Sequence, residues 1–65
     1  MKNTDGERLD WLIFNSAKVC HSRDGDCCWV RFYYEEAILE TETTFSYARD
    51  AIDAAMSGYV RVKWD

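Results

Sequence analysis

The stretch CHSRDGDCC, residues 20–28, contains all three cysteines and the only histidine of this 65-residue chain. Thiolate and imidazole groups are preferred ligands of zinc, and a Cys–His pair can also act as a nucleophile and its base. Either chemistry requires several side chains to converge on one point. The candidates are Cys20, His21, Cys27 and Cys28, and the local backbone decides whether they can meet.

The Asp24-Gly25 pair within this stretch predicts a tight β-hairpin. Asp-Gly is a favoured sequence for a two-residue type I′ turn, whose central residues both need positive φ. With that turn His21 faces Cys28 across the hairpin, while Cys20 points to the opposite face. The ligand set is therefore split between two faces, and we expect no metal site. A small zinc- or thiol-dependent domain using the four residues stays open as the alternative function.

The same register bears on catalysis by a Cys–His pair. His21 and Cys28 share a face with apolar residues of both strands, which predicts a core position for Cys28 and partial burial for His21. A nucleophile would also need a third group that orients the base, and an oxyanion site. The sequence indicates neither, so we expect no catalytic residue and no enzymatic activity.

Two segments have the apolar spacing of helices. The first covers about residues 5–15, and the second lies within residues 43–58 with Gly58 just past its end. The expected caps are Thr4 or Asp5 for the first helix and Thr44 or Ser46 for the second. The stripes expected to face the core are Leu9, Leu12, Ile13 and Ser16 in the first, and Phe45, Ala48, Ile52, Ala55 and Met56 in the second.

Strands are expected on both sides of the Asp24-Gly25 turn, in residues 37–43 after a turn at Glu35-Glu36, and in residues 59–64. In the last of these, Val60, Val62 and Trp64 alternate with polar residues and should share one face. The fold class is therefore α+β. We expect a single two-layer domain over residues 1–65, with the order α-β-β-β-α-β, an antiparallel hairpin or meander, and both helices on one sheet face. Residues 1–4 should be frayed.

The sheet face turned away from the helices is a candidate binding surface. The predicted register places three residues there as a cluster beside Arg31, with Tyr59 adjacent; these three are Trp29, Tyr33 and Ile38. Aromatic residues and Arg are enriched at the centres of protein interfaces, and an exposed apolar patch on a small domain often marks one. We expect it to bind a protein partner, or a second copy of the chain, unless a helix or the N-terminal tail covers it.

Acidic residues dominate the segment between Arg31 and Arg49, which contains no basic residue. The four glutamates are Glu35, Glu36, Glu40 and Glu42. They predict a solvated edge of the sheet or a contact surface for a basic partner. The net charge of −4 and the scattered basic residues make nucleic-acid binding an unfavoured function, because such binding requires a basic patch that neutralises phosphates.

The N-terminus MKNTDGERLDW lacks the apolar core of a signal peptide, and no apolar run is long enough to cross a bilayer. An odd number of cysteines is atypical of a secreted disulfide framework. We expect a cytoplasmic protein with free thiols, no cofactor and no membrane partner.

Two blocks, ERLDWL at residues 7–12 and ARDAIDAAM at residues 48–56, resemble small open reading frames of bacteriophages and prophages of Gram-negative bacteria. Many of those begin with an ERL-WL-type helix and close on an EAIDAAM-type helix, whereas this chain continues into YVRVKWD. The resemblance implies a phage accessory protein in a bacterial cytoplasm and transfers no catalytic residue. Together with the sheet face, it predicts a non-enzymatic protein-interaction module.

Overall fold

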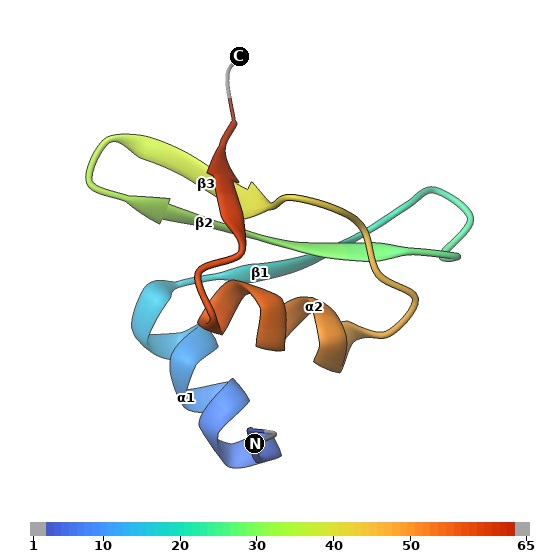
Figure 1. Cartoon of the computed structure of the whole chain (residues 1–65), viewed down its shortest axis with the longest axis horizontal. Coiled ribbons are helices and arrows are strands. Elements are labelled where there is room, and N and C mark those ends of the chain that lie inside the picture. Colours follow the sequence, from blue (N-terminus) through green and yellow to red (C-terminus); the bar gives the residue numbers. More distant parts are fainter. Residues whose placement is uncertain (1–2, 64–65) are drawn as a thin grey trace.

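The computed structural model describes residues 3–63. Two helices and four strands form a two-layer α+β domain, with both helices on the same side of an antiparallel sheet (Figure 1). The strands lie side by side in the order β1-β2-β3-β4, so the predicted fold class is confirmed. Along the chain the elements are α1 (Asp5–Asn15), β1 (Lys18–His21), β2 (Cys28–Tyr34), β3 (Ala37–Thr41), α2 (Ala48–Met56) and β4 (Val60–Val62).

Helix α1 begins at a capping box. The Thr4 hydroxyl accepts a hydrogen bond from the backbone N–H of Glu7 at 3.1 Å, and the Glu7 carboxylate accepts one from the backbone N–H of Thr4 at 2.8 Å. These bonds satisfy donors that the first helical turn leaves without partners, and they lower the pKa of Glu7. The predicted helix bounds and the Thr4 cap are confirmed. Asn3 is also held, since its amide donates to Asp53 at 2.9 Å.

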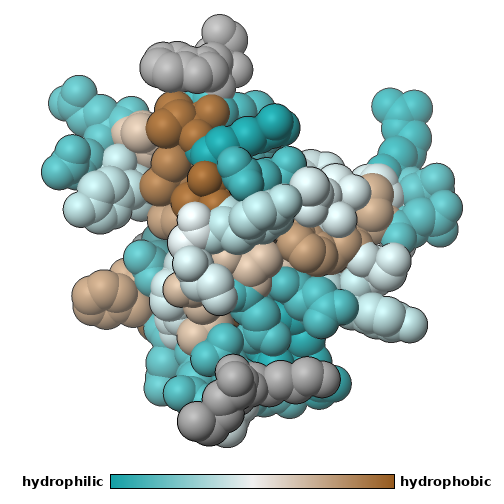
Figure 2. All heavy atoms as spheres, in the orientation of Figure 1, coloured by the Kyte–Doolittle hydropathy of each residue, from teal (hydrophilic) through white to brown (hydrophobic). Residues whose placement is uncertain are grey.

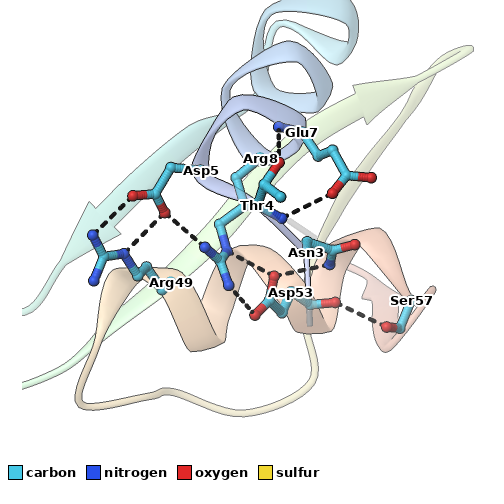
Figure 3. Close-up of polar contacts among 8 residues, drawn as sticks. All are labelled: Asn3, Thr4, Asp5, Glu7, Arg8, Arg49, Asp53 and Ser57. Carbon is cyan, nitrogen blue, oxygen red and sulfur yellow. Dashed lines mark hydrogen bonds and ion pairs between the residues drawn. The ribbon is translucent and has the colours of Figure 1, made fainter. Parts of the chain in front are cut away.

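Arg8 joins the two helices, a contact that the sequence analysis missed (Figure 3). Its side chain is only 10% exposed and donates two parallel hydrogen bonds to Asp53 of α2, at 2.8 and 2.9 Å. It donates a third to Asp5 at 2.7 Å, and Asp5 in turn accepts two from Arg49. The bond from Arg49, and then that from Arg8, lowers the pKa of the Asp5 carboxyl. This chain of charges fixes α1 against α2.

The face of α1 that meets the core differs from the predicted stripe. Trp11 and Leu12 pack against the core, and the Trp11 ring meets Phe32 edge to face at 5.2 Å between centroids. Leu9 and Ile13, expected inside, are 57% and 69% exposed. Because Arg8 lies one helical turn before Trp11 and Leu12, its bonds to α2 turn that side of the helix inward and the other two residues outward.

The register of the first three strands is confirmed. Residues 18–21 of β1 pair with residues 28–31 of β2, with His21 opposite Cys28 as expected. Arg31 pairs with Glu40, and Tyr33 with Ile38, so residues 37–41 do form a strand. Alternation along β2 buries one face and leaves the other half-exposed. A shift of the strand register by one residue would move the buried side chains into solvent and destabilise the fold.

The loop between β1 and β2 keeps this register without the predicted turn. Within this loop only Gly25 has a positive φ, at 80°. A type I′ turn would need positive φ at Asp24 as well, so the predicted turn type is wrong. Ser22 accepts from the Gly25 N–H and its own N–H donates to the Cys27 carbonyl. The Asp24 carboxylate accepts from the Ser22 hydroxyl and the Asp26 N–H, which lowers the Asp24 pKa. These side-chain bonds stabilise a loop in which Asp24 keeps the ordinary negative φ.

Segment 42–47 continues the sheet before α2 begins. Phe45 forms an isolated antiparallel bridge with Cys28, with N···O distances of 2.7 and 2.8 Å. The predicted helix caps at Thr44 and Ser46 are therefore wrong, as is helical placement of Phe45: the cap position is Tyr47, which makes no side-chain cap bond. The backbone N–H and C=O of Phe45 pair with Cys28 of β2, so Phe45 is extended and the helix starts only at Ala48.

Helix α2 ends at Met56 with Ser57 as its C-cap, and Gly58 just past the end has a φ of 86°, which confirms its expected role. Strand β4 then pairs with β3, with Arg61 opposite Glu40. Trp64 lies outside the described residues. The core between the layers consists of Cys28, Val30, Phe32, Ala51, Ile52 and Ala55, with Met56 packed against it. Ile52, Ala55 and Met56 thus face the core as predicted, whereas Ala48 is exposed.

The turn between β2 and β3 contains the strained residue Glu35, with a φ of 56°. We expect Glu35→Gly to raise the free energy of unfolding by about 1 kcal/mol, because glycine reaches positive φ without a Cβ clash. Glu36→Gly is the matched control: Glu36 lacks positive φ, and the variant should lose stability through a more flexible unfolded chain. Urea unfolding measures both, and an equal effect of the two changes would contradict the reasoning.

Arg8 and Arg49 offer a second comparison, since both bind carboxylates but only Arg8 is buried. Arg8→Ala leaves Asp53 without its bidentate partner between the helices, whereas Arg49→Ala removes an exposed pair that water screens. The loss of urea midpoint should be about three times larger for Arg8→Ala. Equal losses would show that the link between the helices contributes little.

Candidate functional site

The residues of CHSRDGDCC do not converge. Cys28 is 3% exposed in the core, and its thiol donates to the Phe45 carbonyl at 3.4 Å. His21 pairs with it across the hairpin but is exposed, which corrects the expected partial burial; it is the last residue of β1. Cys20 lies on the opposite face, and Cys27 precedes β2.

This arrangement gives little support to metal or thiol chemistry. Within residues 3–63, no group of three or more His, Cys, Asp or Glu side chains is positioned to hold a metal ion, and the three cysteines are free thiols. Burial raises the pKa of Cys28, which disfavours the thiolate that a nucleophile or ligand requires. The alternative function through these four residues therefore lacks a site in the described part of the chain.

The face of the sheet turned away from both helices is open, and we call it the outer sheet face. Its members follow from the strand registers: Lys18, Cys20, Trp29, Arg31, Tyr33, Ile38, Glu40, Arg61 and Lys63. In β2 the opposite face buries Cys28, Val30 and Phe32. On the outer sheet face Trp29 and Arg31 are half-buried and Tyr33 is 62% exposed. Neither described helix covers this face, since the core residues of both pack on the other side.

The structure brings most of the predicted binding residues together. Trp29, Arg31 and Tyr33 alternate along β2, and Ile38 pairs with Tyr33. Tyr59 lies just before β4, where its carbonyl accepts from the Glu42 N–H, and it is 45% exposed. It therefore stands at the end of the face rather than within the cluster.

A cavity of about 280 Å³ opens on the outer sheet face between Trp29 and residues 41–44. Arg31, Glu40, Arg61 and Lys63 also line it. The Glu40 carboxylate, 13% exposed, lies 3.6 Å from each guanidinium group. That distance permits an ion pair but exceeds a hydrogen bond. The buried Nε of Arg31 has no hydrogen-bond partner among the described residues.

The four glutamates predicted as an acidic edge are distributed over different places. Glu35 and Glu36 form the exposed β2–β3 turn, and Glu42 is exposed beyond the other end of β3. Glu40 faces the two arginines instead of solvent. Glu35 and Glu36 are neighbours in the turn, and Glu40 and Glu42 line the same cavity, so the four form two separate pairs and not one acidic edge.

A second exposed surface lies on α1, and the sequence analysis missed it. Leu9, Ile13 and Phe14 are 57%, 69% and 89% exposed. The sequence did contain a signal for this surface: the apolar residues of α1 cover a wider face than one packed side of a helix can bury. Hydrophobic residues also gather near the C-terminal end of β4 (Figure 2), where Tyr34, Ala37, Ile38, Leu39 and Val62 line a shallow depression.

Comparisons with protein-family models, with curated proteins and with solved structures give no match to this chain. Neither of the described helices has the length and apolar character needed to cross a membrane.

The three thiols should differ in reactivity. Cys20 and Cys27 are half-buried and should react with Ellman's reagent in the native protein, whereas Cys28 should react only when the domain opens. Its raised pKa adds to this protection, because the thiolate is the reacting form. Absorbance kinetics of the three single-cysteine variants would measure the rates. Fast native reaction of Cys28 would contradict the placement.

Proposed function

We propose that this chain is a non-enzymatic protein-interaction module that binds its partner through the outer sheet face. The observation that carries the proposal is the uncovered face itself: Trp29, Arg31 and Tyr33 lie in a row on a central strand with no described helix over them. Aromatic side chains and Arg supply large contact area and hydrogen bonds, and they dominate the energetic centres of interfaces.

The rigidity of the face favours this function. Strands β2 and β3, which carry most of its residues, are each hydrogen-bonded to a strand on both sides. The opposite side of β2 packs in the core. A preorganised surface loses little conformational entropy on association. The mechanism is steric and electrostatic complementarity, without bond chemistry.

The setting is part of the same proposal. The ERLDWL and ARDAIDAAM blocks support a phage or prophage accessory protein that acts in a bacterial cytoplasm on a host or phage protein. A second copy of the chain is the other occupant that such a face could accept, and light scattering of the purified protein distinguishes the two.

Affinity capture with matched variants tests the face. The immobilised chain is exposed to lysate of a Gram-negative bacterium, and Tyr33→Glu should abolish a specific band that the parent chain retains. Tyr47→Glu is the control, because Tyr47 is 72% exposed but precedes α2, away from the outer sheet face. Circular dichroism verifies the fold of each variant.

A third variant, Phe14→Glu, examines the exposed side of α1. Loss of the band with Phe14→Glu but not with Tyr33→Glu would move the interface to α1 and overturn the proposed face. Equal retention by all variants would also overturn it.

A further inference from the structure

The outer sheet face has a charge opposite to that of the whole chain. Among its nine strand-register residues are four basic ones, Lys18, Arg31, Arg61 and Lys63, and one acidic one, Glu40. Glu42 follows β3 and lines the cavity on this face, so the basic residues of the described face still outnumber the acidic ones. The whole chain carries a net charge of −4, so the residues outside this face carry an excess of negative charge. Such local segregation on an uncovered face is a charge pattern that attracts an anionic partner.

The strand registers place four of these side chains in one line across the sheet. Lys18 pairs with Arg31, Arg31 with Glu40, and Glu40 with Arg61. Like charges that face each other on neighbouring strands repel. Within this line one carboxylate, Glu40, lies between two guanidinium groups, and Glu42 is the other acid that lines the cavity.

The cavity shows that this balance is incomplete. Glu40 lies 3.6 Å from both Arg31 and Arg61, beyond hydrogen-bond distance. The Nε of Arg31 is buried and makes no hydrogen bond to the described residues. A buried donor without an acceptor carries a desolvation penalty. The terminal guanidinium nitrogens of Arg31 and Arg61 are the donors nearest to Glu40, and at 3.6 Å they do not form hydrogen bonds with it. The cavity thus has guanidinium donors and space for a further carboxylate beside Glu40 and Glu42.

We propose that this cavity binds a carboxylate side chain from a short acidic segment of the partner protein, whose neighbouring residue packs on Trp29. The inference rests on the proposed function and specifies the chemistry of its partner. Arg61 is the accessible member of the pair, with its side chain 60% exposed against 32% for Arg31, so Arg61 would meet the segment first.

Acidic loops bound the face and favour a short segment over a nucleic acid. Glu35 and Glu36 stand at one end of the β2–β3 ladder, and Asp24 and Asp26 lie in the loop at the far end of β2. A long polyanion running along the strands would meet both groups. A segment that crosses the four strands spans about 14 Å, roughly four extended residues, and stays over the basic line.

A titration followed by nuclear magnetic resonance tests the inference on the intact chain. The probe is a short peptide with Glu at alternate positions and one central Phe; the same peptide with Lys in place of Glu, and oligothymidine of similar length, are the comparisons. The Glu peptide should shift the Trp29 indole N–H and the Arg31 Nε–H signals, with affinity that falls as salt rises.

Arg61→Glu and Arg23→Glu form a matched pair, since each changes the net charge equally and both residues are exposed. Arg61→Glu should weaken binding of the Glu peptide about tenfold or more, and Arg23→Glu less than about twofold. Equal losses, absence of shifts at Trp29 and Arg31, or tighter binding of oligothymidine would each overturn the inference.

The affinity capture separates this inference from the proposed function. A band that is lost with Tyr33→Glu but is insensitive to Arg61→Glu and to salt would refute the carboxylate site and leave the interaction module standing. Loss of the band with both variants supports the two together.

Discussion

The salt bridge between Arg8 and Asp53 determines how the two helices lie on the sheet. Arg8 is buried between the helices. Its two parallel hydrogen bonds to Asp53 fix the rotation of α1 about its own axis. Trp11 and Leu12, on the same side of the helix, then pack on the core. A buried arginine without this partner would destabilise the domain, so the bridge acts mainly by selecting one arrangement of α1.

That arrangement also determines which surfaces stay open. Because α1 packs largely on α2, the helical layer is confined to one side of the sheet, and the residues of α1 that point away remain in water (Figure 1). The outer sheet face is the counterpart of this layering. Its basic line and its aromatic residues follow from strand alternation, since each core residue of β2 is followed by one that must face outward.

Much of the fold was predictable because it depends on local alternation. The Cys28–Tyr34 strand, its partners and the Thr4 cap follow from short-range patterns that the structure confirms. The predicted turn type at Asp24-Gly25 was wrong because the hydrogen bond between the Ser22 hydroxyl and the Asp24 carboxylate stabilises a different loop from the one that Asp-Gly favours. The Arg8–Asp53 bridge and the cavity between Trp29 and residues 41–44 arise from contacts between distant segments, which spacing along the chain does not reveal.

The bridge between Phe45 and Cys28 has a consequence for solubility. The Cys28 end of β2 extends past β3, and its free N–H and C=O groups would otherwise present an unpaired ladder to a neighbouring molecule. Phe45, in segment 42–47, forms hydrogen bonds with both of these Cys28 groups, so the end of β2 is paired. At this end of β2, though not along the outer strands β1 and β4, the chain thereby offers no unpaired backbone for intermolecular strand addition, the first step of edge-to-edge aggregation.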